Sequence, residues 1–315
     1  MKKRWILFII IIILIIIALT WYIIYKILFF PSQIMKYRPD DGKYEDLYLK
    51  IGDCSGRSYH QKEMEKEKEK SKDKYINVWY FNSFPNKKII LFFHGNSGNI
   101  SERDYIIDIC NKFKLNLLLV DYRGFGNSDG IPSITGIFQD GLTAYSFLRT
   151  RHIANKIIVW GESLGGSVAI YVASKRKCKC LILLSTFACL EDIVYNYKFL
   201  SWTGPILGFL VQSVVEPIPS KIWITNISCP VAIIHSKDDE IIPPINGKIL
   251  YQSVKHVCKI YLRIRGKHAS PKISEEQFEK IFKFADINTN ICSSKVVKKI
   301  IDNLEKVAEN NGLIP

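Results

Sequence analysis

The amino-acid sequence predicts an α/β domain in which helices cover both faces of a mostly parallel β-sheet, preceded by one transmembrane helix. Short apolar runs of strand length alternate with longer segments of helical pattern over most of the chain, an order typical of parallel sheets. After the apolar N-terminal stretch, roughly 285 residues remain, which suits a single domain. A glycine-flanked serine, Ser163, stands between one predicted strand and one predicted helix.

The N-terminal stretch predicts a membrane anchor. No charged residue occurs from Trp5 to Tyr25, and isoleucine dominates, so a helix here would be long enough to cross a hydrocarbon core of ~30 Å. Its apolar core is too long for a cleaved signal peptide. We therefore assign residues 1–30 to a signal anchor and 31–44 to a juxtamembrane linker. We expect the anchor to act as a simple tether that adds nothing to the core of the sheet.

The orientation of this anchor is set by a narrow margin. Basic residues occupy positions 2–4 before the span, and Lys26, Lys36 and Arg38 follow it, so the positive-inside rule gives a near tie. A short basic tail ahead of a first span usually stays in the cytoplasm, which favours a type II topology. Asn99-Ile100-Ser101 and Asn226-Ile227-Ser228 have the form of glycosylation acceptors but do not decide the side.

The remaining residues, 45–290, are expected to form the α/β domain. Within it, 52–74 is a charged insertion in which Glu and Lys alternate, so that it forms either a short solvated helix or a disordered segment. Residues 187–220 are expected to form a small cap, and 291–315 a helical tail. The apolar runs predict strands at 46–51, 75–81, 88–93, 115–122, 156–160, 180–184, 231–236 and 259–264, and helices near 101–114, 134–150 and 166–174.

The turn at Ser163 points to nucleophilic chemistry. The chain reads Gly161-Glu162-Ser163-Leu164-Gly165 between a buried strand and a helix. A serine on such a tight turn is held in a strained backbone with its hydroxyl exposed, and glycines are needed where side chains would collide with the strand and helix. The same turn directs the backbone N–H of Leu164, at the positive end of the helix, to where an oxyanion would form.

A serine nucleophile needs a base, and the base needs an acid to orient it. His268 follows the predicted strand 259–264 and is therefore the candidate base. Three carboxylates, Asp238, Asp239 and Glu240, follow the strand 231–236, at the sheet edge where the serine turn also lies. Structural or solvated roles are expected for the other histidines, and for His235 a packing role at the end of its strand.

Five motifs in this order resemble those of α/β-hydrolases. They are His94 to Asn99, Asp121 to Gly126, Gly161 to Gly166, His235 to Pro243, and Gly266 to His268. Within that superfamily the chain is similar to membrane-anchored, single-domain serine hydrolases, which include protein depalmitoylases and related acyl hydrolases. The chain departs from these relatives at Ala269-Ser270, where a polar pair of the Asn-Asp type is usual.

The resemblance implies a role for each site residue. Ser163 would be the nucleophile, His268 the base and Asp239 the acid, since the family's acid lies four residues beyond the position of His235. The backbone N–H groups of Asn96 and Leu164 would form the oxyanion hole. No metal or organic cofactor is implied.

The expected function is hydrolysis of an ester, thioester or related acyl bond, with a small molecule, a lipid or a lipidated protein as substrate and the bilayer as partner. An aminopeptidase-like amide hydrolase is an alternative, for which Glu191 or Asp192 in the cap could bind a substrate amine. A non-catalytic membrane scaffold is an alternative of another class.

Composition excludes other classes. The formal net charge is +14, but the lysines are spread along the chain and no aromatic-basic module accompanies them, so nucleic acid is not an expected partner. Attraction to an anionic membrane surface is the simpler consequence. The eight cysteines are not expected to form a disulfide framework in a domain of this size. The uncharged stretch 199–215 is either a pair of packing helices or an apolar lid.

Overall fold

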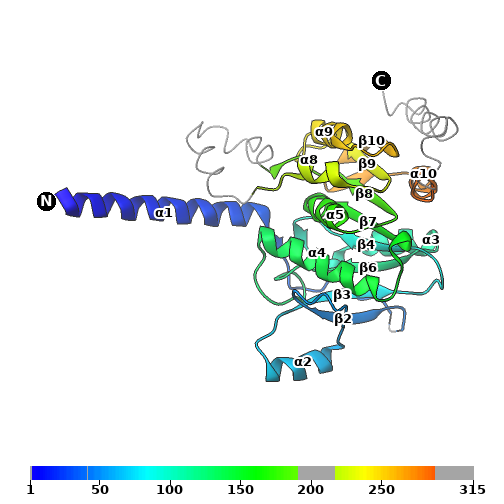
Figure 1. Cartoon of the computed structure of the whole chain (residues 1–315), viewed down its shortest axis with the longest axis horizontal. Helices are drawn as coiled ribbons and strands as arrows, with labels where there is room; N and C mark the ends of the chain where they lie inside the picture. The colour runs from blue at the N-terminus through cyan, green and yellow to red at the C-terminus, as the bar shows by residue number, and fades with distance from the viewer. Residues whose placement is uncertain (1, 41, 191–216, 288–315) are drawn as a thin grey trace.

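The computed structural model describes residues 2–40, 42–190 and 217–287. Most of the predicted cap, including Glu191 and Asp192, and all of the predicted tail 291–315 lie outside this range. The described residues form one body with a long N-terminal helix that projects from it (Figure 1).

A nine-stranded sheet forms the centre of the body (Figure 1), with the order β11-β10-β9-β8-β7-β4-β6-β3-β2. The six strands from β10 to β6 in this order are parallel, whereas β3 and β11 run antiparallel to their neighbours. The strands are β2 (Glu45–Lys50), β3 (Tyr75–Phe81), β4 (Ile89–Phe93), β6 (Asn116–Val120), β7 (Ile157–Glu162), β8 (Cys180–Leu184), β9 (Val231–Ser236), β10 (Lys259–Lys267) and β11 (Ser270–Lys272).

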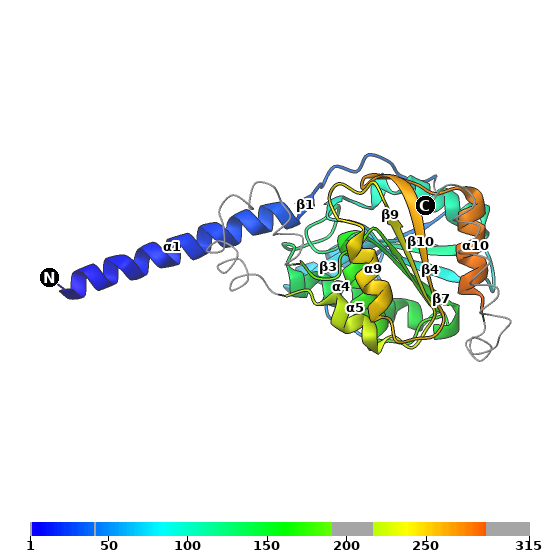
Figure 2. The same cartoon turned by 90° about the horizontal axis from the view of Figure 1, so that it is seen from above.

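Helices cover both faces of this sheet, as the sequence predicts (Figure 2). Alternate residues of β4 belong to two separate core clusters, Leu91 to one and Phe92 to the other, because successive side chains of a strand point to opposite faces. The cluster of Leu91 contains residues of α4 (Ile134–Arg149), α5 (Leu164–Lys175) and α9 (Ile245–Ser253). The cluster of Phe92 contains residues of α3 (Asp104–Lys112) and α10 (Glu275–Ala285). Short helical turns complete the body: η1 (Ile100–Glu102), η2 (Ala154–Lys156), α8 (Ser220–Trp223) and η4 (Ile224–Asn226).

The predicted strands all form, with ends shifted by a few residues. The predicted strands end at 259–264 and do not include β11, which pairs with β10 as an antiparallel hairpin. The charged insertion forms a helix, α2 (Gln61–Lys70), whose one buried residue, Met64, packs beside Tyr48 and Tyr75. Sequence analysis did not anticipate α9 or α10, although Ser274 and Gln277 form a capping box at the start of α10.

Helix α1 spans Lys2–Leu28 and extends away from the sheet (Figures 1 and 2). Its apolar side chains from Trp5 to Leu14 are all exposed. No helix within residues 2–40, 42–190 and 217–287 combines the length and the hydropathy that a membrane span needs. The predicted transmembrane helix therefore stays a prediction.

The residues after α1 are not the simple tether that we expected. Phe29 is buried in the core cluster that contains Leu91, and Tyr25 and Leu28 pack against the same cluster. Phe30–Pro31 forms a short strand, β1, which pairs in parallel with β5 (Ser97–Gly98). The end of the predicted anchor 1–30 and the first residue of the predicted linker 31–44 are thus part of the packed domain.

Candidate active site

Ser163 lies on the sharp turn between β7 and α5. Its backbone has φ +52° and ψ −120°, a region that residues with a side chain rarely adopt. The turn is held in place by the Ser163 N–H, which donates to the Leu184 carbonyl at 2.9 Å. The Ser163 carbonyl accepts from the hydroxyl of Thr186 at 2.7 Å and from the Gly166 N–H at 3.0 Å. The strained backbone is thereby fixed on both sides.

Glycines permit this turn, as the sequence suggests. A Cβ on Gly161 would lie 2.2 Å from the carbonyl oxygen of Gly165, and a Cβ on Gly165 would lie 2.1 Å from that of Phe93. Both distances are far below van der Waals contact, so the first turn of α5 approaches β4 and β7 only where side chains are absent.

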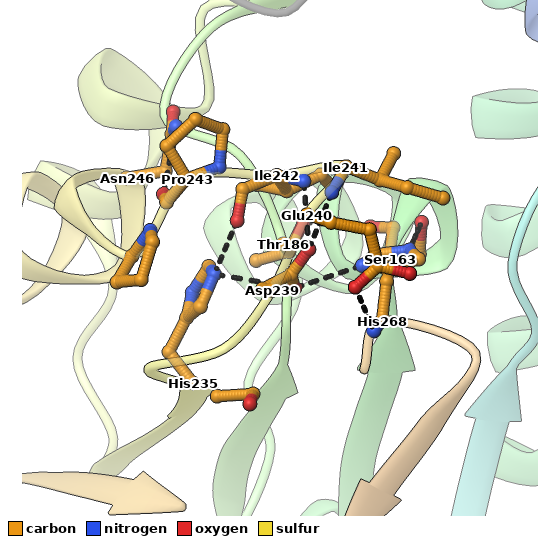
Figure 3. A network of polar contacts seen from close by, with 12 residues as sticks. Ser163, Thr186, His235, Asp239, Glu240, Ile241, Ile242, Pro243, Asn246 and His268 are labelled. Atoms are coloured by element: carbon orange, nitrogen blue, oxygen red, sulfur yellow. Dashed lines mark hydrogen bonds and ion pairs between the residues drawn. The ribbon is translucent and has the colours of Figure 1, made fainter. Parts of the chain in front are cut away.

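Three predicted residues are joined by hydrogen bonds (Figure 3). Nε2 of His268 lies 3.0 Å from Oγ of Ser163, and Nδ1 lies 2.8 Å from Oδ2 of Asp239. These residues come from the turn after β7, the loop after β9 and the turn between β10 and β11. The parallel strands β7, β9 and β10 end at one edge of the sheet, and this topology gathers the three side chains.

Of the three candidate carboxylates, Asp239 alone contacts the His268 imidazole among the described residues. Its other oxygen accepts the N–H groups of Ile241 at 3.0 Å and Ile242 at 2.8 Å. Asp238 accepts the N–H of Gly266 at 3.2 Å. Glu240 accepts the backbone N–H of His268 at 3.1 Å, so it holds the turn and not the ring.

The environment favours an ionised Asp239. Burial raises the pKa of this carboxyl, but the hydrogen bond and charge of His268, with the N–H of Ile242, outweigh it and lower the pKa below the ordinary 3.8. The carboxylate is buried, whereas the His268 side chain is 11% exposed. The arrangement holds an anion behind an imidazole that reaches the surface of the site.

An apolar pocket opens onto the serine. Its cavity volume is about 180 Å³. Asn96 and Leu164, the predicted oxyanion donors, line it together with Ser163 and His268. The apolar lining residues are Leu28, Phe30, Leu164, Phe187, Leu190, Ile241 and Ile242. The first N–H groups of a helix have no partner within it, and Leu164 is the first residue of α5, so its N–H is free of the helical ladder.

A second pocket of about 440 Å³ shares His268. It is more polar, with Glu102, Arg103 and Glu162 among its lining residues. The guanidinium of Arg103 donates to the Ser97 carbonyl at 2.7 Å, and the hydroxyl of Tyr105 donates to Glu162. His268 therefore lies at the boundary of an apolar and a polar pocket.

Sequence analysis underestimated His235. As expected, its side chain is buried at the end of β9, but it also belongs to the polar network (Figure 3). Its Nε2 lies 2.9 Å from the Ile242 carbonyl and 3.5 Å from Oδ2 of Asp239. Burial lowers the pKa of His235 below the ordinary 6.5. The sequence carries no signal for this contact, because the contact depends on how the loop after β9 folds back.

His94 has the structural role that was expected. It is fully buried, with Nδ1 2.8 Å from the Gly95 carbonyl and Nε2 3.2 Å from the carboxylate of Asp121. The hydroxyl of Tyr122 donates to the His94 carbonyl at 2.9 Å. This network supports the loop that carries Asn96.

Among residues 2–40, 42–190 and 217–287, no group of three His, Cys, Asp or Glu side chains could hold a metal ion.

Comparisons with known proteins show sequence similarity to hydrolases. A profile of the family described as Serine aminopeptidase, S33 matches residues 85–219. The alpha/beta hydrolase domain-containing protein WAV2 of Arabidopsis thaliana is 34% identical over 192 residues, which cover 56% of this chain and 61% of the plant protein. The lysophosphatidylserine lipase ABHD12 of Danio rerio is 30% identical over 188 residues, covering 55% of this chain and 49% of the lipase. The chain thus spans about half to two thirds of the length of the curated relatives it matches.

The fold also matches solved structures. The Pyrococcus furiosus esterase Pf2001 superimposes with a TM-score of 0.59 at 17% identity, over 82% of this chain and 96% of the esterase. At such low identity the likeness concerns the fold alone.

Proposed function

We propose, from the premise that this chain belongs to the α/β-hydrolase superfamily, that it is a membrane-anchored serine hydrolase. It cleaves an ester, thioester or related acyl bond through a covalent acyl-enzyme. Ser163 is the nucleophile, His268 the general base and Asp239 the acid that orients it.

The single observation that carries this proposal is the hydrogen-bonded series from Ser163 through His268 to Asp239 at the mouth of an apolar pocket. As Oγ of Ser163 attacks the substrate carbonyl, Nε2 of His268 takes its proton, and the Asp239 carboxylate stabilises the imidazolium. The imidazolium then returns the proton to the leaving group. A water molecule, deprotonated by His268, releases the acyl group and restores Ser163.

The backbone N–H groups of Asn96 and Leu164 stabilise the tetrahedral intermediate. Both residues line the pocket beside Ser163. Each such donor is worth about 3–4 kcal/mol of activation free energy by comparison with other acyl-transfer enzymes.

The substrate class follows from the pocket and the relatives. The apolar walls suit an acyl chain, and the more polar pocket beyond His268 suits the leaving group. Lysophosphatidylserine lipase is the name of several proteins that are similar to this one over about half of their length. We therefore expect an acyl ester of a lipid first, with a palmitoyl thioester on a protein as another member of the same class.

The anchor in this proposal is α1. Its exposed isoleucines, leucines and Trp5 are costly to leave in water and would be covered by lipid. We propose a single-pass, type II arrangement, in which the body lies beside the bilayer that supplies its substrate.

A second candidate is hydrolysis of an aminoacyl amide, which the description of the matched family profile favours. The two carboxylates that could bind a substrate amine, Glu191 and Asp192, fall outside the described residues. A third possibility is a non-catalytic scaffold. It gives no role to the hydrogen bonds that join Ser163, His268 and Asp239.

Labelling and substrate profiling test the proposal. The purified full-length protein in detergent should react with a fluorophosphonate probe at Ser163, and it should turn over acyl esters or thioesters faster than aminoacyl amides. Preference for the amides would transfer support to the second candidate. Absence of both labelling and turnover, in a protein with a cooperative unfolding transition, would leave only the scaffold.

A further inference from the structure

The chain that leaves α1 runs beside the loop that carries Asn96. The N–H of Phe30 donates to the Asn96 carbonyl at 2.8 Å, and the N–H of Ser32 donates to the Gly98 carbonyl at 3.1 Å. These bonds form the parallel pair of β1 with β5. They join residues that are more than sixty positions apart in the sequence, so they are tertiary contacts and not a local turn.

A buried amide closes the same contact from the other side. Nδ2 of Asn99 donates to the carbonyls of Ser32 at 3.0 Å and Ile34 at 2.9 Å. Its Oδ1 accepts the backbone N–H of Ser101 at 2.9 Å. Asn99 is fully buried, so its amide is unavailable as a glycosylation acceptor in the folded protein. Its side chain instead fastens the segment after α1 to the turn that follows Asn96.

The side chains of this segment reach the core and the catalytic pocket. Phe29 is buried, with its ring centroid 6.5 Å from that of Phe125. Leu28 and Phe30, on either side of it, line the pocket that contains Ser163. Ile34, later in the same segment, is 73% exposed and does not line that pocket.

We propose that residues 28–34 are a working part of the active site, in which the backbone positions the oxyanion loop and Leu28 and Phe30 form the acyl-chain subsite. This inference rests on the proposed function, since it assigns a substrate subsite to that hydrolase. The hydrogen bond from Phe30 fixes the Asn96–Ser97 peptide, and therefore restrains the adjoining Gly95–Asn96 peptide, which presents the Asn96 N–H. An apolar chain bound beside Ser163 would contact Leu28 and Phe30, which line the pocket together with Phe187 and Leu190.

The subsite is tested by the dependence of kcat/KM on acyl length. Leu28→Ala and Phe30→Ala are compared with Ile34→Ala, a matched control in the same segment, on p-nitrophenyl esters of two to twelve carbons. We expect the ratio of kcat/KM for long esters to that for short esters to fall about tenfold in the first two variants. Each of them removes apolar contact with the acyl chain. The ratio should be unchanged in Ile34→Ala. Equal ratios in all three variants would overturn the subsite.

The positioning role is tested by removing backbone donors of this segment, each compared with an alanine variant that keeps the donor. Ser32→Pro deletes the N–H that bonds to Gly98, whereas Ser32→Ala keeps it. Phe30→Pro and Phe30→Ala form a second pair at the Asn96 carbonyl, in case one proline variant does not fold. We expect each proline variant to lower kcat by about tenfold to a hundredfold relative to its alanine partner. KM should be the same within each pair, and so should the acyl-length profile.

The outcomes separate this inference from the proposed function. Wild-type protein that neither reacts with fluorophosphonate nor hydrolyses any ester would contradict the proposed function itself. Active wild-type protein whose proline and alanine variants share the same kcat would show that residues 28–34 only pack against the domain.

Discussion

The imidazole of His235 lies 3.5 Å from Oδ2 of Asp239, the same oxygen that His268 contacts at 2.8 Å (Figure 3). Two histidines therefore lie beside one carboxylate, but their burial and their other hydrogen-bond partners differ. His235 is buried and lies 2.9 Å from the Ile242 carbonyl through Nε2; this contact requires an N–H at Nε2, so in the neutral ring Nδ1 carries no proton. His268 lies at the pocket, where its other nitrogen meets Ser163.

This difference predicts a pH dependence of stability. Burial holds the pKa of folded His235 below the ordinary 6.5, so as the pH falls below about 6.5 the unfolded chain takes up a proton first and the free energy of unfolding decreases. His152, whose pKa is also lowered by burial, acts in the same direction. Asp239, with a pKa below 3.8, stabilises the fold above that pH and is not titrated in this window.

Urea unfolding of wild type and His235→Gln at pH 7.5, 6.5 and 5.5 measures the effect. The variant should lose less stability than wild type between pH 6.5 and 5.5, by at most about 1.4 kcal/mol per pH unit for one proton. Identical slopes for the two proteins would mean that the pKa of His235 is the same in the folded and the unfolded protein.

Ser163→Ala should abolish fluorophosphonate labelling and turnover while the protein keeps its unfolding temperature, because the hydroxyl supplies chemistry and not packing. Ser185→Ala is the matched control. Ser185 also follows a parallel strand and has a positive φ, of +46°, but within the described part of the chain His268 bonds to Ser163, Asp239 and Glu240 and not to Ser185. Turnover that survives in Ser163→Ala would exclude this serine as the nucleophile.

Asp239→Asn should reduce kcat about 10⁴-fold, by comparison with serine proteases in which the same change favours the wrong imidazole tautomer. Asp238→Asn, one residue away, replaces the carboxylate that accepts the Gly266 N–H by a neutral amide, which can still accept it, and should retain most activity. Steady-state kinetics on one ester compares the two variants. A larger loss in Asp238→Asn would show that the acid is assigned one position too late.

The buried ion pair between Arg123 and Asp140 predicts a large effect on stability. The guanidinium lies 2.7 Å from the carboxylate, and the Asp140 side chain is fully buried in α4. Arg123→Met would leave that charge without its cation and should lower the free energy of unfolding by about 3–5 kcal/mol. Lys112→Met removes an exposed pair with Glu275 and should cost less than about 1 kcal/mol. Equal losses of unfolding free energy in the two variants, measured by urea unfolding, would contradict the stabilising role of the buried pair.

Two truncations distinguish a tether from a structural segment. Removal of residues 1–20 keeps Phe29, β1 and the contacts of Asn99, so turnover of a short water-soluble ester should be unchanged. Removal of residues 1–36 deletes those contacts and should lower both kcat and the unfolding temperature. Equal activity of the two truncated proteins would restore the simple tether that the sequence suggested.

Local sequence signals predicted the centre of the site but not its surroundings. Ser163 was identifiable because glycines, a strand and a helix surround it in the sequence, and His268 and Asp239 because each follows an apolar run. The assignment of Asp239 over Asp238 depended on resemblance, since spacing alone does not say which side chain turns toward the imidazole. The geometry around Asp239 now gives the physical reason, in the N–H groups of Ile241 and Ile242 that hold it.

The surroundings depend on contacts between distant parts of the chain. Nothing in Phe29-Phe30-Pro31 reveals a partner at Asn96, because a two-residue strand has no periodicity to detect. Likewise His235 resembles any buried strand residue until the loop after it folds back and brings Asp239 to its ring. The ends of the strands were predicted to within a few residues since apolar runs define them directly.

The backbone of Ser163 has a further consequence for evolution. A side chain at φ +52° and ψ −120° costs on the order of 1–3 kcal/mol, while glycine at the same place would cost roughly 0.5–1 kcal/mol of chain entropy. The first cost is the larger, so Ser163→Gly should make the fold more stable and the protein inert. Drift toward glycine is the stabilising direction at this turn, and a lineage that lost the need for hydrolysis would be expected to take it.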